Sequence, residues 1–349
     1  MKATSGQRLN MTGAGRYAEL AAAVRSFKAG LLQPNQVNRL VETGSLSETV
    51  SMVTEGHVTT ASATDLIPVE SYLIERVIEL AQRLTSYAPY DSRALIKLIA
   101  AAHEYACIKE ILKAISDQVS PEEALAHIVP AGKFTPEKCK ELLESRNPSR
   151  VIETFGDEAF KRFVTPKLAA EKGGMTAVGS VDQYYYRKLW EASNLPDPLD
   201  AQSARGLIGE LIDHLNILLC FRARLMELNA RAASDMMIPV NYGLGHVLTE
   251  MSEAASTQSL LRILEKTPYS RALQGQGVMD GGVVERMLSR SHAQTCLNAF
   301  AGSPFNVGLA LAFLFLKNYE LRDLFSLING KANNVPADRI AESLILAHR

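Results

Sequence analysis

The stretch Asp213-His214-Leu215-Asn216-Ile217-Leu218-Leu219-Cys220-Phe221-Arg222 decides the fold. It begins with an acid, has a polar residue three positions later and a base six positions after that, with mostly apolar residues between them. On an α-helix, Asp213 and Asn216 share one face, whereas Arg222 lies about 180° round and more than ~10 Å along the axis. The spacing therefore predicts a helix whose base does not pair with its own acid.

The same spacing recurs along the chain. The other copies are Glu19/Ala22/Lys28, Glu104/Cys107/Lys113 and Glu320/Asp323/Asn329, the last with Asn in place of the base. Two short helical segments joined by a turn follow three of the copies, at 37–53, 139–155 and 247–264. Such recurrence predicts an internally repeated helical protein. We expect three helical modules and closing C-terminal helices, with bounds at 14–95, 96–200, 201–310 and 311–349.

The rest of the chain also favours helices. No segment shows the apolar–polar alternation of a β-strand. Apolar residues recur at helical spacing instead, and Ser45, Ser120 and Thr135 stand where helix caps are expected. The glycine-rich stretch 173–181 is predicted to be a loop or a domain joint. The stretch 194–200, which contains two prolines, is predicted to be a linker. We therefore predict an all-α fold.

The composition limits the partners. The chain has 349 residues, of which 47% are hydrophobic and 21% charged, as in ordinary globular proteins. Its formal net charge of −1 supplies no global positive field for nucleic acid or an anionic membrane. The run Tyr184-Tyr185-Tyr186 suits base stacking, but the mixed charges around it favour helix packing. We expect no nucleic-acid partner.

The cysteines and the apolar runs indicate the compartment of the protein and whether it crosses a membrane. Cys107, Cys139, Cys220 and Cys296 form no CxxC pair, which indicates reduced, buried thiols in a cytosolic protein. The N-terminal residues lack the apolar core of a signal peptide. The longest apolar run, Val307–Leu316, has about half the length needed to cross a bilayer, so we expect no transmembrane segment.

The sequence contains no recognisable catalytic motif. Its seven His residues are scattered and form no HExxH. Gly243-Leu244-Gly245 follows no predicted strand, no Gly-Gly pair leads into a GK[ST] motif, and no GxSxG surrounds a serine. We therefore expect no catalytic residue, no cofactor and no metal site. A repeated all-α chain of this kind is most simply a scaffold or coupling element rather than an enzyme.

Motifs in the C-terminal part resemble the closing segment of one family, the C subunit of archaeal-type (A/V-type) rotary ATPases, equivalent to the d subunit of the vacuolar ATPase. The motifs there are Ser303–Val307, Ala310–Lys317, Glu320–Leu324, Gly330–Ala332 and Pro336–Ile340. Earlier stretches that resemble the family in the same order are 25–32, 37–50, 104–113, 181–190, 212–222 and 264–273. One departure is Asn329, which stands where the family usually has Arg. The ordered set covers nearly the whole chain.

The resemblance implies a structure and a role. The expected fold is three similar helical domains arranged as a pseudo-threefold funnel. The expected partners are the central-shaft subunits of the D and F type and the membrane rotor ring of proteolipid subunits. The chain would then be a non-catalytic central-stalk subunit that transmits torque for ATP-coupled H⁺ or Na⁺ transport. It would sit peripherally on the cytoplasmic face of the membrane.

A torque socket needs stiffness and many points of grip, so polar helix positions are the candidate contacts with partners. Our candidates are Arg25, Lys28, Glu104, Lys109, Lys113, Asp213, Asn216, Arg222, Arg224, Glu320, Arg322 and Asp323. Two other functions stay open on the residues alone. One is a helical-repeat adaptor unrelated to the ATPase, and the other is an all-α enzyme with a polar pocket.

Overall fold

The computed structural model describes residues 13–58, 65–168, 173–274 and 280–348. These ranges contain only helices as regular secondary structure and no β-strand, which confirms the all-α fold. The helices are α1 Gly13–Lys28, α2 Pro34–Glu42, α3 Leu46–Val53, α4 Ile67–Tyr87, α5 Tyr90–Ala100, α6 Ala102–Ser116, α7 Pro121–Leu125, α8 Pro136–Ser145, α9 Pro148–Phe155, α10 Glu158–Leu168, α11 Gly173–Ala192, α12 Pro198–Leu225, α13 Ala230–Met236, α14 Val247–Glu253, α15 Thr257–Leu264, α16 Gly281–Ala299, α17 Gly308–Ala332 and α18 Ala337–Ser343, with short 3₁₀ helices η1 Ser270–Leu273 and η2 Leu346–His348.

Local capping explains many of the helix starts. The side chains of Ser45, Ser120 and Thr135 each accept a hydrogen bond from the backbone amide three residues later. These bonds satisfy amides that have no partner within the helix, as the sequence predicted. The linker expected at 194–200 is shorter than predicted, because Asp197 caps α12 and Pro198 is its first residue.

The loop predicted at 173–181 is wrong, because α11 runs through it from Gly173. The side chains of Ala177 and Val181 are completely buried there. Helix α11 packs along α6 and α10 and joins the largest apolar core. Burial on this scale outweighs the cost of about 1 kcal/mol that each glycine imposes on a helix.

Two of three pairs of short helices rest on a single long helix, and the third rests on α17 and the short helix α18. The pair α8–α9 packs on α6, and the pair α14–α15 packs on α12. The first pair, α2–α3, packs on α17 and α18, whereas α1 packs on α4 and α17. Accordingly, Val37 and Leu40 of α2 share an apolar cluster with Leu321 and Leu324 of α17. The N-terminal helix pair is therefore completed by the C-terminal end of the chain.

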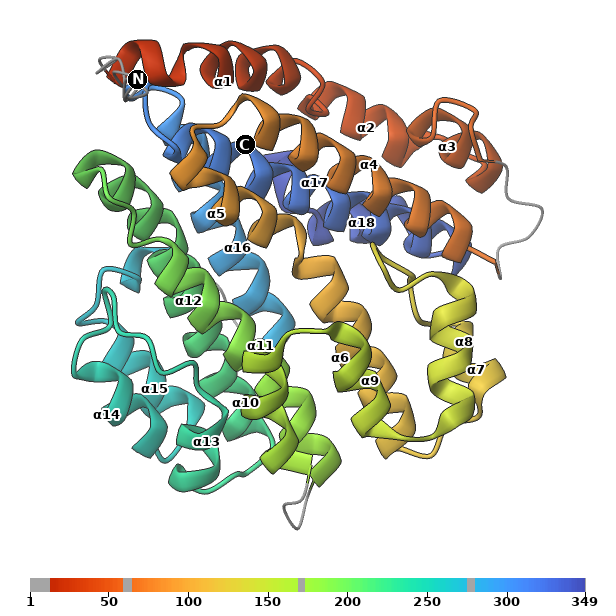
Figure 1. Cartoon of the computed structure of the whole chain (residues 1–349), viewed down its shortest axis with the longest axis vertical. Coiled ribbons are helices and arrows are strands. Elements are labelled where there is room, and N and C mark those ends of the chain that lie inside the picture. Colours follow the sequence, from red (N-terminus) through yellow and green to blue (C-terminus); the bar gives the residue numbers. More distant parts are fainter. Residues whose placement is uncertain (1–12, 59–64, 169–172, 275–279, 349) are drawn as a thin grey trace, which may run out of the picture.

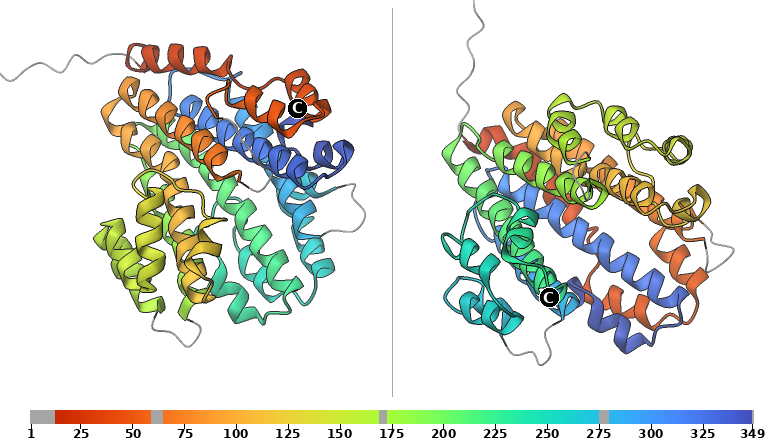
Figure 2. Two further views of the ribbon diagram at one scale, coloured as in Figure 1. Left: turned by 90° about the vertical axis from the view of Figure 1, so that its right-hand side faces the viewer. Right: turned by 90° about the horizontal axis from the view of Figure 1, so that it is seen from below.

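Helix α17 is the central element. Within its first third, Leu309–Leu316, every residue is at most 6% exposed. It contacts α1, α3, α4, α5, α12 and α16. Figure 1 shows it beneath α4, and both views of Figure 2 show it running among the N-terminal helices. A helix that is apolar all round is stable only when it is covered on all sides, and the neighbours supply that cover.

Candidate partner-binding surfaces

The acid of the repeated spacing binds a backbone amide in two of the long helices. In α6, Oε1 of Glu104 accepts a hydrogen bond from the amide of Lys133 at 3.2 Å. In α12, Oδ2 of Asp213 accepts one from the amide of Gly243 at 2.6 Å. Both amides lie in the connection that leads into a pair of short helices. The acid therefore anchors that connection to the long helix.

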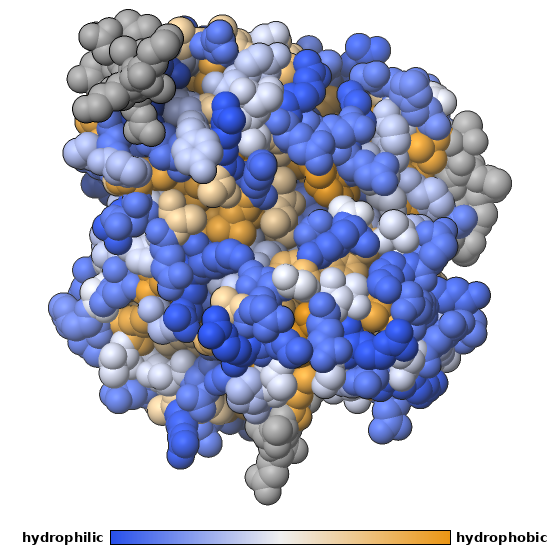
Figure 3. Space-filling model, in the orientation of Figure 1, coloured by the Kyte–Doolittle hydropathy of each residue, from blue (hydrophilic) through white to orange (hydrophobic). Residues whose placement is uncertain are grey.

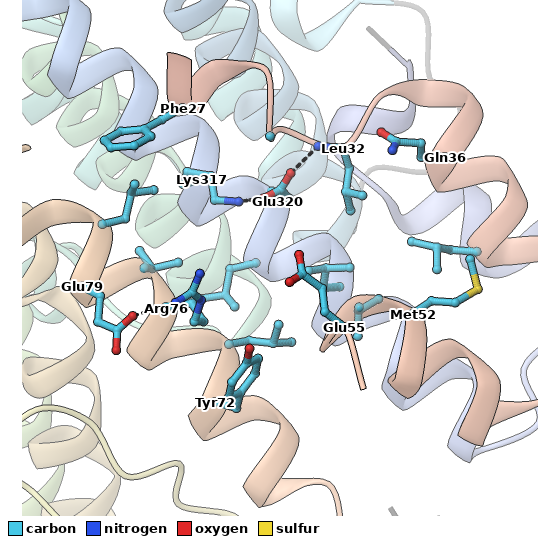
Figure 4. Close-up of a pocket in the computed structure, with 18 of the residues that line it drawn as sticks. Phe27, Leu32, Gln36, Met52, Glu55, Tyr72, Arg76, Glu79, Lys317 and Glu320 are labelled. Carbon is cyan, nitrogen blue, oxygen red and sulfur yellow. Dashed lines mark hydrogen bonds and ion pairs between the residues drawn. The ribbon is translucent and has the colours of Figure 1, made fainter. Parts of the chain in front are cut away.

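Helix α17 repeats this arrangement for the first helix pair. Oε1 of Glu320 accepts a hydrogen bond from the amide of Leu32 at 2.5 Å, and Leu32 lies just before α2. The other oxygen of Glu320 binds the ammonium of Lys317. Figure 4 shows both contacts at the floor of a hollow between α1–α3 and α4. Glu320 is only 3% exposed. The three acids therefore act alike, as clamps on the backbone.

The polar residue three positions after the acid is a second anchor. The amide side chain of Asn216 binds both the N–H and the C=O of Ile238, at 2.8 and 3.0 Å. Asp323 accepts hydrogen bonds from the amides of Ile345 and Leu346, each at 2.7 Å. Asn216 is completely buried and Asp323 is 6% exposed. In this structure their polar atoms serve the fold.

Burial shapes the electrostatics of the two aspartates. Asp213 is completely buried, and desolvation raises its pKa in spite of the hydrogen bonds that it accepts from Tyr269 and Gly243. Burial likewise raises the pKa of Asp323 to about 6. Removing a carboxylate from water disfavours its charged form, and hydrogen-bond donors offset only part of that cost. These groups are structural carboxylates that the fold keeps away from solvent.

The bases at the end of the spacing lie on the surface. Arg222 is exposed and binds one oxygen of Glu285 in α16 at 2.8 Å. Arg322, which lies two residues after Glu320 and not at the end of that copy, is also exposed and binds the other oxygen of Glu285 at 2.7 Å. Lys113 is exposed and pairs with Asp117 at 2.9 Å. No base pairs with the acid of its own copy among these contacts, which agrees with the geometric prediction. Exposed ion pairs of this kind contribute little stability, so exchanging them for contacts with a partner costs little.

The other basic candidates differ in exposure. Arg25 is exposed on α1, whereas the ammonium of Lys28 lies 4.0 Å from the centre of the Phe300 ring. Lys109 is half-buried and pairs with Asp182 of α11 at 3.0 Å. These contacts join α1 to the end of α16, and α6 to α11.

Arg224 has a different environment. One of its nitrogens donates to the carbonyl oxygen of Ala254 at 2.9 Å, and its other two nitrogens are buried without a hydrogen-bond partner. The Cys220 thiol lies near this guanidinium, whose charge opposes the rise that burial causes in the thiol's pKa. Arg224 therefore connects the end of α12 to the end of α14 rather than presenting its charge fully to solvent.

A second repeat escaped the sequence analysis. Three helices begin at or just after a triplet of proline, a large apolar residue and Asp or Asn: Pro89-Tyr90-Asp91, Pro198-Leu199-Asp200 and Pro304-Phe305-Asn306. The apolar side chains are 88%, 66% and 42% exposed, respectively. Scattered exposed apolar residues are normal, but three in equivalent positions form a pattern. The signal was present in the sequence as a triplet that recurs at three helix starts.

These three helix starts meet at one end of the molecule. Asp200 of α12 accepts hydrogen bonds from the hydroxyl of Tyr17 at 2.5 Å and from the amide of Val307 at 2.8 Å. Arg16 of α1 pairs with Asp91 of α5. Figure 1 shows the starts of α1, α5, α12 and α17 at the same corner, beside the label N. We call this corner the apolar-tipped end.

The hollow in Figure 4 contains one of the candidate residues, Glu320. It has a volume of about 550 Å³ and is lined by α1–α3, α4 and α17. Its walls carry Arg76 and Glu79, which pair with each other at 2.9 Å. Figure 3 shows that blue, hydrophilic side chains cover most of the face that is in view, with orange apolar surface between them.

Comparison with known proteins shows which family has this sequence pattern. The model of the ATP synthase (C/AC39) subunit family matches residues 20–343. The chain belongs to this family. It is similar to the A-type ATP synthase C subunit of Methanocaldococcus jannaschii, with 23% identity over 94% of this chain and 86% of that protein. It is also similar to the C subunit of Methanosphaera stadtmanae, with 25% identity over 93% of this chain and 86% of that protein. The C subunit of Methanosarcina mazei is 22% identical over 96% of this chain and 94% of its own length.

Membership in the C/AC39 family makes the chain a non-catalytic ATP synthase subunit and confirms the resemblance seen in the sequence. Asn329, the residue that departs from the family pattern, donates a hydrogen bond from its side-chain amide to Oε1 of Glu70 at 2.8 Å. Within the described ranges no helix is both long and apolar enough to span a membrane. The same ranges hold no cluster of three or more His, Cys, Asp or Glu side chains placed to bind a metal ion.

Proposed function

We propose that this chain is a central-stalk subunit that links the rotating shaft of an A/V-type ATPase to its membrane rotor ring. Its partners would be shaft subunits of the D and F type and the proteolipid ring. It would transmit torque for ATP-coupled H⁺ or Na⁺ transport from a peripheral position on the cytoplasmic face. The observation that carries this proposal is the family match over residues 20–343.

The anchored connections support a mechanical role. A part that carries torque must not let its short helices slide along its long ones. Glu104, Asp213 and Glu320 each tie a helix pair to a long helix through a backbone amide. Asp213 and Glu320 are buried, where charge-assisted hydrogen bonds are strong and directional. Glu104 is only half-buried, and its bond of 3.2 Å is the longest of the three. Three such ties, one for each helix pair, suit a stiff socket.

The repeated ties also support a three-module organisation, the basis of the proposed funnel. We propose that the first module takes its long helix from α17, because α2–α3 packs there and Glu320 supplies the tie. The second module would be built around α6 and the third around α12. The proposed bounds of the first module thus include residues of 311–349 together with 14–95.

The apolar-tipped end is the proposed contact with a partner of the complex. Tyr90, Leu199 and Phe305 project there, and large apolar side chains are the residues that anchor protein interfaces. The exposed cations Arg222 and Arg322 offer a second, polar contact surface. Electrostatic contacts of this kind set orientation and association rate more than affinity.

The test is recovery of the ATPase from detergent-solubilised membranes with a tagged chain. The wild type should bring down both shaft and ring subunits in stoichiometric amounts. Leu199→Glu should reduce the recovery of one of them at least tenfold. Val335→Glu is the matched control, since Val335 is 40% exposed and lies just after the far end of α17, about 35 Å from the start of that helix. Recovery of neither partner by the wild-type chain would refute the proposed function.

A further inference from the structure

The second module differs from the other two at the position three residues after the acid. Asn216 and Asp323 each make two hydrogen bonds to backbone groups at this position. In α6 the equivalent residue is Cys107, whose sulfur lies 3.6 Å from the sulfur of Cys139 in α8. Thiols are weak hydrogen-bonding groups. The second module therefore has the weakest non-covalent anchor at this place.

The two sulfurs are arranged to react with each other. Both side chains are buried, Cys107 at 2% exposure and Cys139 at 0%. A covalent bond requires the sulfurs to approach from 3.6 Å to about 2.05 Å, a movement of roughly 1.5 Å that small side-chain rotations can supply. The other two cysteines of the chain, Cys220 and Cys296, lie on α12 and α16 and are also free.

We propose that Cys107 and Cys139 form a redox-convertible pair that becomes a disulfide between α6 and α8 when the protein meets a peroxide. The reduced pair is the resting form in a reducing compartment. The disulfide replaces a weak contact by a covalent tie, at the place where the other two modules hold their loops by paired hydrogen bonds. This proposal does not depend on the proposed function.

The chemistry balances with hydrogen peroxide as the oxidant. The Cys139 thiolate attacks one peroxide oxygen, the O–O bond breaks, and Cys139 becomes a sulfenic acid while hydroxide leaves. The Cys107 sulfur then attacks the sulfur of Cys139, the S–O bond breaks, and water leaves with the Cys107 proton. Overall, two thiols lose two hydrogens and two electrons, and one peroxide becomes two waters.

Hydrogen bonding within the pair supports this order of steps. The contact between the two sulfurs lowers the pKa of Cys139, and the same contact together with burial raises the pKa of Cys107. Burial raises the pKa of Cys220 to about 12 and raises that of Cys296 well above its usual value. The thiolate is the nucleophile in such reactions, so Cys139 should react first.

The experiment treats the purified full chain with hydrogen peroxide under native conditions and then counts its thiols after unfolding. We expect the count to fall from four to two, the mass to fall by two hydrogens, and peptide mapping to link residue 107 to residue 139. Dithiothreitol should reverse all three changes. The oxidised chain should melt about 5 °C higher, because the crosslink restricts the unfolded chain.

Variants separate this pair from general thiol oxidation. Cys220→Ser should still lose two thiols to the same disulfide. Cys107→Ser should form no intramolecular disulfide and should leave Cys139 as a higher oxide. The proposal is overturned if the wild type keeps four thiols while a surface methionine is oxidised in the same sample, or if the mapped crosslink joins any other cysteines. The map of the wild type decides the question even where a variant fails to fold.

Discussion

Replacing Asp213 by alanine should destabilise the chain by about 3 kcal/mol. Oδ2 of Asp213 accepts hydrogen bonds from the Gly243 amide at 2.6 Å and from the Tyr269 hydroxyl at 2.5 Å, inside the protein. Alanine leaves both donors without an acceptor, and each buried unpaired donor costs about 1–3 kcal/mol. Removing the carboxyl also relieves its own desolvation, which is why its pKa is raised, and this relief offsets part of the loss.

The measurement is the free energy of unfolding in urea, with hydrogen exchange at Gly243 as the local readout. The Gly243 amide should lose protection in Asp213→Ala. A double-mutant cycle with Tyr269→Phe should give a coupling energy above about 1 kcal/mol, because the two side chains share one hydrogen bond. Glu19→Ala is the control. Glu19 holds the same place in the repeated spacing but is exposed on α1, so its loss should change stability by less than about 0.5 kcal/mol.

Two outcomes would refute this reasoning. If Asp213→Ala and Glu19→Ala cost the same, the spacing alone would set the role of the acid and the clamp would have no energetic meaning. If the cycle shows no coupling between Asp213 and Tyr269, the short contact contributes nothing beyond packing. A loss of stability with unchanged protection of the Gly243 amide would place the effect elsewhere in α12.

Three further predictions follow from single contacts. Burial raises the pKa of Glu210 to about 7 from an ordinary 4.5, so its contribution to stability is fully present below pH 4.5 and is lost as the pH rises through 7. Between pH 5 and pH 8 the free energy of unfolding in urea should therefore fall by about 2.5 kcal/mol through this group, and Glu210→Gln should abolish that part of the decline. Gly132 has a φ of +55°, and an added Cβ would lie 2.1 Å from Oε1 of Glu104, so Gly132→Ala should lower the Tm by about 3 °C in calorimetry. Asp323→Ala frees the amides of Ile345 and Leu346, so limited proteolysis should remove the C-terminal residues at least tenfold faster than from Ser326→Ala, whose side chain is exposed on the same helix.

The helical class and the three short helix pairs could be predicted because local rules decide them. Caps such as Ser45 and Thr135 act within a few residues, and the structure uses both as predicted. The prediction for residues 173–181 was wrong because distant contacts, not local rules, decide the structure there. The glycines of this stretch disfavour a helix locally, but Ala177 and Val181 are buried against distant segments, and that packing is invisible in a single local window.

The candidate contacts show where spacing stops being informative. Glu19 and Asp213 occupy the same place in the pattern, yet one is exposed and the other is completely buried. Whether a polar helix position faces solvent depends on which neighbours cover it, and the pattern contains no information on that. The motif that does lie on the surface, a proline followed by a large apolar residue, was hidden because Tyr90 and Leu199 resemble ordinary core residues in a sequence.

The role of α17 explains why counting repeats along the chain gave three modules and a remainder. The sequence pairs α2–α3 with α1, because α1 precedes it and carries the spacing. The structure instead covers the apolar face of α2, including Val37 and Leu40, with residues of α17. Glu320 then ties Leu32 in place as the acids of the other long helices tie their own loops. The C-terminal helix α17 therefore covers the helix pair that follows α1, and this packing is the basis of the first module that we propose.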